Sequence, residues 1–234
     1  MIHTAYIHDF SETGDPAAAA RTDGRAIEAL GETLAGSGKP LVVASGTALL
    51  APGRAATEED TMPDDTPHPR VSERVALQFA ENDGVRVSVM RLPPSVHGQG
   101  DHGFVPALIG IARGKGLAAY VGDGSNRWPA VHRLDAARLF RLALESAPAG
   151  ARLHAVGDEG VPFRDIAAVI GRHLNLPVTE ISREEADAHF CGFALFASMD
   201  VPAASAITQR RFGWHPVQPG LIADLDAGHY FDKA

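Results

Sequence analysis

Side chains that can carry protons gather in one glycine-rich stretch. His97, Asp101 and His102 lie close together there, and His132 follows a run typical of a strand. A neutral imidazole can accept or donate a proton near pH 7, so these histidines are candidates for contact with a substrate. A metal site needs several converging ligands, and this spacing matches no standard zinc pattern. We therefore predict substrate-facing roles for His97, His102 and His132, and no metal.

Two aromatic residues flank the same region. Phe104 and Trp128 are large enough to close a pocket over a small organic substrate. The alternative is ordinary packing in a hydrophobic core, which is the commonest role of such side chains. Both interpretations remain open at the level of sequence, and we carry both residues as candidate substrate contacts.

The first part of the chain alternates between strand-like and helix-like segments. Apolar runs predict strands over residues 2–7, 41–44 and 85–90. Apolar residues at helical spacing predict helices over residues 16–35 and 71–81. Strands that alternate with helices indicate parallel βαβ units, so we expect an α/β fold.

The second part of the chain is more mixed. It holds predicted helices and short strands, followed from residue 183 by helical segments broken at Pro202, Pro216 and Pro219. The predicted helices span residues 104–112, 134–146 and 163–174, and the predicted strands span residues 117–121, 153–156 and 178–181. No linker-like stretch separates the two parts, so we expect residues 1–234 to form a single unit.

Composition narrows the class of protein. The net charge is −8, which argues against a nucleic-acid partner. Neither a long apolar run nor a signal-peptide pattern is present, so the sequence predicts no membrane span and no secretion. The single cysteine, Cys191, fits a reducing compartment, and we expect the protein to be cytoplasmic. Because Cys191 lies between Phe190 and Gly192, we predict that it is a small buried residue.

Several short segments stand out by their order and spacing: His3-Thr4-Ala5, Ser45-Gly46-Thr47, the stretch from Arg91 to Gly98, Val131-His132 with Asp135 and Ala137, and Trp214 with Pro216. Together they resemble the segments of extended or atypical short-chain dehydrogenases/reductases, the group related to nucleotide-sugar epimerases and dehydratases. The resemblance covers residues 1–230. It implies a doubly wound parallel sheet that binds NAD or NADP beyond the carboxyl ends of its strands.

The resemblance also implies which residues border the cofactor. Ala5 would lie along the diphosphate and ribose, because its small side chain lets the backbone approach the cofactor. Pro93, Pro94 and Val96 would border the nicotinamide ring, and Arg91 belongs to the same set of cofactor contacts. Each of these residues falls at or near a predicted strand end.

Ser45 and Thr47 are the candidate catalytic residues. They lie where the resemblance places a hydroxyl group that orients the substrate. The alternative is that each hydroxyl bonds the local backbone of a turn.

Two departures from the family pattern concern function. The glycine-rich turn that brings backbone N–H groups to a pyrophosphate is missing, and we interpret Gly98-Gln99-Gly100 and Gly122-Asp123-Gly124 as simple turns. We therefore expect weak or absent binding of NAD or NADP. The Tyr-x-x-x-Lys pair is missing too: if Ser72 is aligned with the serine that commonly precedes the lysine, Pro69 and Glu73 occupy the tyrosine and lysine positions.

These observations predict a partial doubly wound, Rossmann-like parallel sheet with a small mixed C-terminal lobe. Residues 1–95 would form the remainder of the nucleotide-binding fold, and residues 96–234 would form mostly the substrate-side lobe with late sheet elements. The implied function is an atypical NAD(P)-dependent oxidoreductase or epimerase/dehydratase-like activity on a small or sugar-like molecule. The alternatives are a non-catalytic binding or interaction module and a truncated form of a complete enzyme.

The resemblance also implies assembly. We expect a homodimer formed through the helices near residues 16–35 and 71–81. The first predicted strand, with Ile2, Ala5 and Ile7 on a sheet edge, would favour further association, because apolar edges template strand pairing.

Overall fold

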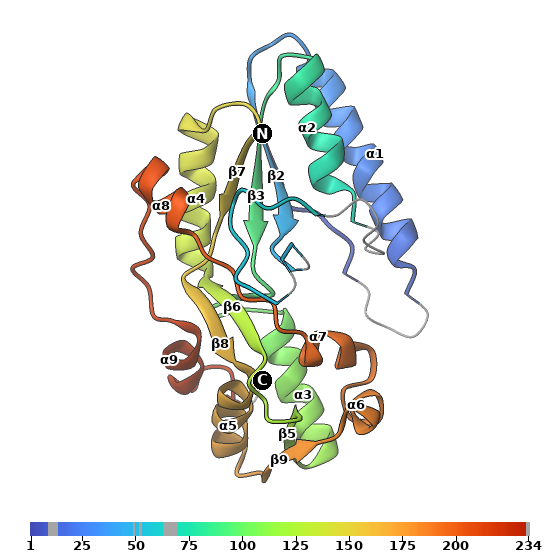
Figure 1. Cartoon of the computed structure of the whole chain (residues 1–234), viewed down its shortest axis with the longest axis vertical. Coiled ribbons are helices and arrows are strands. Elements are labelled where there is room, and N and C mark those ends of the chain that lie inside the picture. The colour runs from blue at the N-terminus through green and yellow to red at the C-terminus, as the bar shows by residue number, and fades with distance from the viewer. Residues whose placement is uncertain (9–13, 49, 52, 63–69, 233–234) are drawn as a thin grey trace.

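The computed structural model describes residues 1–8, 14–48, 50, 51, 53–62 and 70–232. Figure 1 shows two stacked parts, an upper part built on a parallel sheet and a lower part built on shorter strands and helices. The first strand lies in the upper part. Elements from the second half of the sequence return to the upper part, so the two parts interleave along the chain.

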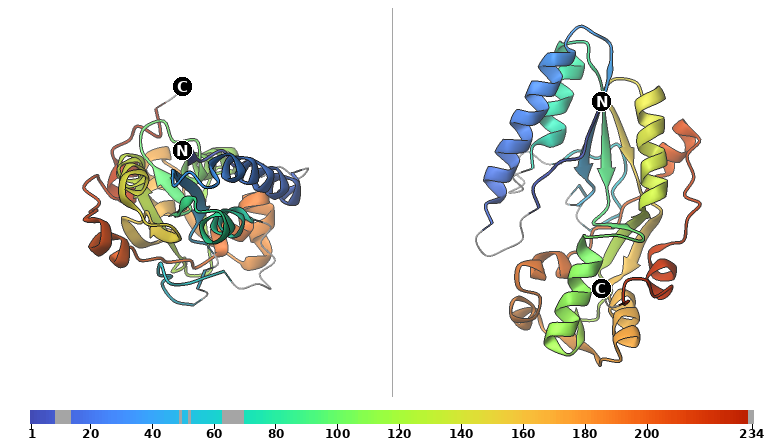
Figure 2. Two further views of the ribbon diagram at one scale, coloured as in Figure 1. Left: turned by 90° about the horizontal axis from the view of Figure 1, so that it is seen from above. Right: turned by 180° about the vertical axis from the view of Figure 1, so that it is seen from behind.

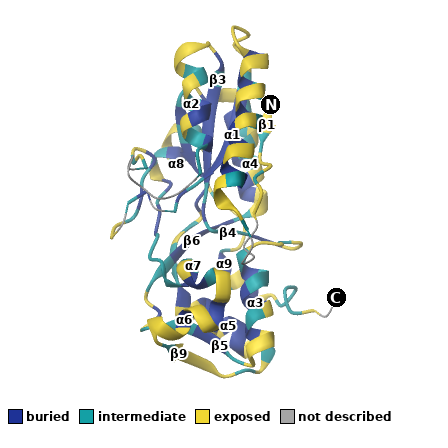
Figure 3. Ribbon diagram, turned by 90° about the vertical axis from the view of Figure 1, so that its right-hand side faces the viewer, coloured by how far each residue is buried: buried dark blue, intermediate teal, exposed yellow. Residues whose placement is uncertain are grey.

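The upper part contains a four-stranded sheet in which all neighbouring strands are parallel. Its strands, in spatial order, are β1 (Ile2–His3), β2 (Pro40–Gly46), β3 (Arg86–Leu92) and β7 (Ala151–His154). Strands β2 and β3 are almost continuously buried, and Figure 3 shows β3 as a dark ribbon. A parallel sheet covered on both faces requires such continuous apolar runs.

Helices cover both faces of this sheet. Figure 2 shows α1 (Pro16–Leu34) and α2 (Ser72–Asn82) on one face and α4 (Arg133–Ser146) on the other, with α8 (Ala206–Phe212) beside α4. Helix α1 begins where the Asp15 carboxylate accepts a hydrogen bond from the backbone N–H of Ala18, with Pro16 at the first helical position. Helices α1 and α2 pack tightly because Gly31 faces the ring of Phe79.

The lower part combines two small sheets with short helices. One sheet contains β4 (Ser95–His97), β6 (Arg127–His132) and β8 (Asp158–Pro162), and the other contains β5 (Ala118–Val121) and β9 (Val178–Ile181). The helices are α3 (Phe104–Lys115), α5 (Phe163–Leu174), α6 (Arg183–Phe190), α7 (Ala194–Ser198) and α9 (Leu221–Asp226), with one 3₁₀ turn at Cys191–Phe193. An aromatic and aliphatic core joins them.

The expected α/β class with a Rossmann-like parallel sheet is confirmed, but several elements differ from the sequence prediction. The first strand is only two residues long, and neither β4 nor β8 is among the predicted strands. The prediction that Cys191 is buried is wrong: Cys191 is exposed at the end of α6, and its φ of 51° is left-handed. None of the described helices is both long and apolar enough to cross a membrane.

Candidate functional site

The carboxyl ends of β2 and β3 meet at the lower edge of the upper sheet. In the strand register Ser45 is the partner of Arg91, and Gly46 is the partner of Leu92. The backbone N–H of Thr47 then donates a 3.0 Å hydrogen bond to the carbonyl of Leu92. Open α/β sheets bind ligands beyond these strand ends, so both predicted catalytic hydroxyls, Ser45 and Thr47, lie at the edge where a ligand site is expected.

Thr47 carries an unsatisfied polar group. Its side chain is only 1% exposed, and its Oγ1 atom makes no hydrogen bond to any described residue. Buried hydroxyl groups in proteins normally have a hydrogen-bond partner, so the Thr47 hydroxyl is available to bond a ligand that enters at this edge. The neighbouring Ser45 is buried as well.

Arg91 is fully buried and engaged with protein groups. Its Nε and one terminal nitrogen donate hydrogen bonds of 2.9 and 2.7 Å to the two carboxylate oxygens of Glu73, and its other terminal nitrogen lies 3.2 Å from His154 Nε2. The guanidinium group has no exposed surface. A cofactor contact by this side chain, as the resemblance implies, does not fit such burial, and we assign Arg91 to the support of the sheet edge.

A network of buried polar groups extends from Arg91 along β7. His154 Nδ1 lies 2.8 Å from the carbonyl of Ala204, so Nδ1 donates and Nε2 accepts from Arg91. Burial, and then the charge of Arg91, lower the pKa of His154, which keeps the imidazole neutral. The backbone N–H of His154 donates to Thr208 Oγ1, and the backbone N–H of Thr208 donates to Glu58. This network holds α8 and the segment before it against the sheet edge.

The start of α2 holds a cluster of ion pairs at the position that the sequence aligned with the lysine of the family. Glu73 accepts hydrogen bonds from Arg91 and, at 2.6 Å, from Arg152, so it is part of a structural ion-pair cluster. Ser72 is fully buried and donates a 2.5 Å hydrogen bond to Asp23, which also lies 2.8 Å from His3 Nε2. Pro69 lies outside the described residues. The described part of this segment therefore supplies no proton donor of the Tyr-x-x-x-Lys type.

A tyrosine next to an arginine was missed at the level of sequence. The guanidinium carbon of Arg70 lies 4.2 Å from the ring centroid of Tyr6, a cation–π contact, and Arg70 also donates to the carbonyl of Ala44 and to Ser72 Oγ. Burial raises the pKa of Tyr6 despite the opposing charge of Arg70, so the phenol is protonated at neutral pH. The sequence predicts a strand over residues 2–7, which includes Tyr6, but β1 ends at His3. A prediction with a shorter strand would have placed Tyr6 beyond the strand end, where a ligand site is expected.

The remaining residues with an implied cofactor role lie around the same edge. Ala5 is exposed just beyond β1. Pro93 is buried and Pro94 half-buried in the connection from β3 to β4, while Val96 packs against the core between the sheet and α4. Ala5 and Pro94 thus present surface that a ligand can reach.

The predicted substrate histidines do not form one group. His97 is fully buried: its Nδ1 lies 2.8 Å from Asp224 Oδ2, and its Nε2 has no hydrogen-bond partner within the described ranges. His132 packs edge-to-face on His97 with ring centroids 5.4 Å apart, and its Nδ1 accepts the N–H of Leu134 at the start of α4. His102 is exposed, unlike His97. Nowhere in the described ranges do three or more His, Cys, Asp or Glu side chains form a group suited to a metal ion.

The loop after β4 has the glycine spacing of a phosphate-binding turn, since Gly103 follows Gly98 and Gly100 and the loop leads into α3. The sequence interpretation overlooked this position between a strand and a helix. The backbone N–H of Gly103 donates to Asp101, and the N–H of Gly98 donates to the hydroxyl of Tyr230, which itself donates to Asp101 Oδ2. The chain thus occupies these donors itself. Strand β4 pairs in parallel with β6, and the connection between these two strands contains α3 and the strand β5 of the other small sheet.

Trp128 lies in the core and Phe104 is half-buried against it, which favours the packing alternative that the sequence left open. Trp128 is 1% exposed, and its indole N–H donates a 3.0 Å hydrogen bond to the carbonyl of Phe196. Its ring packs edge-to-face on Phe104 and Phe163, with centroids 5.5 and 5.1 Å apart. Aromatic rings in this arrangement stabilise a core, and the buried Trp128 presents almost no surface to a ligand.

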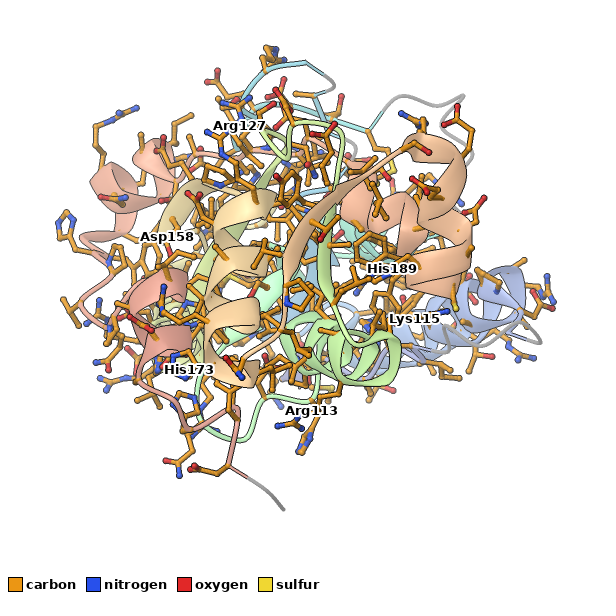
Figure 4. The ribbon with its side chains drawn as sticks, turned by 90° about the horizontal axis from the view of Figure 1, so that it is seen from below. Arg113, Lys115, Arg127, Asp158, His173 and His189 are labelled. Atoms are coloured by element: carbon orange, nitrogen blue, oxygen red, sulfur yellow. The ribbon has the colours of Figure 1, made fainter. Side chains whose placement is uncertain are left out.

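A cleft of about 590 Å³ opens in the lower part, a size typical of ligand pockets. It lies between the turn from β5 to β6 and the helices α6 and α7, and its charged residues are Asp123, Arg127, Arg183 and Asp200. In Figure 4, Arg127 lies on the opposite side of the lower part from His173. The ring of Phe231, near the C-terminus, stacks on His173, so this end of the chain lies away from the cleft.

Comparison with known proteins places the chain in a family. Residues 1–156 match the NAD dependent epimerase/dehydratase family. The chain is 49% identical over 233 residues to an uncharacterized protein of Schizosaccharomyces pombe, covering 99% of this chain and 77% of that protein. The protein belongs to this family. An uncharacterized protein of Saccharomyces cerevisiae is 43% identical over 230 residues, with 98% and 76% covered.

Solved structures share the fold of this family member. A dTDP-glucose 4,6-dehydratase, DesIV from Streptomyces venezuelae with NAD and TYD bound, superposes with a TM-score of 0.76 at 18% identity, covering 97% of this chain and 71% of that chain. The ADP-L-glycero-D-manno-heptose-6-epimerase of Helicobacter pylori gives a TM-score of 0.70 at 15% identity, with 97% and 69% covered. At these identities the similarity concerns the fold, and it agrees with the resemblance seen in the sequence.

Proposed function

We propose that the protein is an atypical NAD(P)-dependent oxidoreductase or epimerase/dehydratase-like enzyme that acts on a small or sugar-like substrate at the lower edge of the upper sheet. The observation that carries the proposal is the buried, unpartnered hydroxyl of Thr47 beside Ser45. Membership in the NAD dependent epimerase/dehydratase family supports the choice of cofactor.

The residues around this edge fit a dinucleotide in part. Ala5 has a small, exposed side chain that allows close approach, and Pro94 and Val96 are half-buried beside the strand ends. When bound, the nicotinamide ring accepts or supplies a hydride. Weak affinity is part of the proposal, because backbone donors in the glycine loop after β4, those of Gly98 and Gly103, are already bonded within the chain.

The described side chains suggest how a proton is handled. Ser45 and Thr47 would hold a substrate oxygen, because an orphaned hydroxyl can donate to it without losing a bond inside the protein. Tyr6 is protonated at neutral pH, and Arg70 beside its ring favours the phenolate that forms after proton donation. We propose Tyr6 as the proton donor in place of the absent Tyr-x-x-x-Lys pair.

The test combines cofactor titration with turnover. Binding of NADH and NADPH is followed by nicotinamide fluorescence, and oxidation of the bound cofactor is measured with a panel of small carbonyl compounds and sugars. Thr47→Val removes the hydroxyl at nearly constant volume and should lower kcat/KM about tenfold. Thr33→Val is the matched control, because Thr33 is exposed on α1 and bonds only its own helix.

The proposal would be contradicted if neither NADH nor NADPH bound to the protein. Equal kcat/KM values for the Thr47→Val and Thr33→Val variants would contradict it as well. A folded chain without cofactor binding would favour the alternative of a non-catalytic binding or interaction module.

The proposal also includes a homodimeric state, which rests on the family resemblance. It includes a cytoplasmic location, which rests on the single cysteine.

A further inference from the structure

The charged groups of the lower cleft balance one another. Arg127 and Arg183 contribute two positive charges to its lining, and Asp123 and Asp200 contribute two negative charges. The remaining lining groups include the amide of Asn126 and the hydroxyls of Ser125 and Ser198, which are neutral hydrogen-bonding groups. The cleft is therefore polar without a net charge.

Arg127 is one of two arginines in the lining through which an anion could bind, and it is already paired with Asp200. Its Nε and one terminal nitrogen donate hydrogen bonds of 2.9 and 2.8 Å to the two oxygens of Asp200, and its backbone N–H donates at 2.8 Å to the same carboxylate. The hydrogen bond from Arg127 lowers the pKa of Asp200 and raises that of Arg127, so both are charged at neutral pH. A bidentate pair of this geometry leaves little of the guanidinium fork for a phosphate.

Asp123 places a second carboxylate in the cleft. It accepts hydrogen bonds from the backbone N–H and the hydroxyl of Ser125, at 2.9 and 2.7 Å, which lower its pKa. A nucleoside diphosphate carries more than one negative charge at neutral pH and would meet both carboxylates. The Asn126 amide nitrogen already donates to the carbonyls of Ala197 and Met199. An uncharged molecule with many hydroxyl groups can instead donate to the carboxylates and accept from Arg183, which also lines the cleft.

We infer that this cleft takes an uncharged, hydroxyl-rich small molecule such as a free sugar or polyol, and not a nucleoside diphosphate sugar. The inference rests on the proposed function, because it treats the cleft as the substrate side of the same site. A chain segment joins the two places: the N–H of Val201 donates to the carbonyl of Arg127, and the carbonyl of Ala204 faces His154 at the sheet edge. Figure 1 shows this segment rising from α7 past the lower ends of the strands to α8.

Direct binding without cofactor tests the ligand class separately from the redox proposal. The backbone amide NMR signals of the isotope-labelled protein are followed during titration with D-glucose, D-galactose, D-mannose, xylitol, UDP and UDP-glucose. We expect saturable shifts of residues 121–127 and 198–200 with at least one neutral compound and none with UDP. Saturable binding of UDP at these residues, or no shift with any neutral compound, overturns the inference.

A charge variant provides an independent arm. Asp200→Asn releases Arg127 and should increase the affinity of the cleft for UDP about tenfold or more. Asp187→Asn is the matched control, because it removes the same charge from an exposed position on α6 outside the cleft lining. A folded Asp200→Asn protein with unchanged UDP binding contradicts the inference. If the Asp200→Asn variant does not fold, the titration of the wild-type protein decides on the ligand class alone. Absence of NADH binding in a parallel titration would contradict the proposed function and would leave the ligand class of the cleft unaffected.

Discussion

At the scale of single residues, Glu73 has the most consequential contacts. It neutralises the fully buried Arg91 and also accepts from Arg152. Glu73→Gln would leave the Arg91 guanidinium buried without a counter-charge, so we expect a loss of about 3 kcal/mol in the free energy of unfolding at pH 7. Urea denaturation of the variant and of wild type measures it.

The pH dependence of this loss follows from the pKa of Glu73. Burial raises this pKa, but hydrogen bonds and charges from Arg91 and Arg152 outweigh burial and lower it overall. The stabilisation by Glu73 is therefore complete above the ordinary carboxylate pKa and is lost as the pH falls toward the depressed value. The difference between wild type and Glu73→Gln should shrink in acid. Glu81→Gln, an exposed change on the same helix, should show neither effect.

At the scale of elements, α1 and α2 depend on a close approach at Gly31. A Cβ atom added at Gly31 would lie 2.5 Å from the ring of Phe79. Alanine favours helix formation by about 1 kcal/mol over glycine, but overpacking costs about 1–3 kcal/mol. We expect Gly31→Ala to destabilise the protein by about 1 kcal/mol, as measured by thermal unfolding.

Two further variants separate the clash from helix propensity. Gly110, within α3, has no neighbouring atom within 4 Å of an added Cβ, so Gly110→Ala should stabilise the protein by about 0.5–1 kcal/mol. Phe79→Leu should rescue Gly31→Ala by making room for the methyl group. Equal effects of the two alanine substitutions would show that α1 and α2 are not held at this distance.

At the scale of the whole molecule, the prediction that can be tested is the formation of a homodimer. Within the described chain, β1 bonds only to β2 and is two residues long, so it offers a short edge for association although Ile2 is 44% exposed. The outer face of α1 is charged through Arg21, Arg25, Glu28 and Glu32. A homodimer through α1 and α2 should therefore be held largely by charge and should dissociate as salt is added.

Light scattering at low and high ionic strength tests this assembly. We expect a dimer at low salt that dissociates toward monomer at high salt, and a weaker dimer for Arg25→Glu. Lys115→Glu, on α3 in the lower part, reverses a charge away from α1 and serves as control. A monomer at every salt concentration would contradict the proposed dimer.

The sequence by itself determined the elements that depend on local signals. The helix Phe163–Leu174 and the strand Val178–Ile181 match their predicted bounds, since Pro162, the apolar spacing and a left-handed Asn175 act within a few residues. Only the tertiary structure decided that Glu73 pairs with Arg91, that Trp128 is core and that the Thr47 hydroxyl is buried without a partner. Those outcomes depend on which distant segments meet, and side-chain type and local spacing do not specify that.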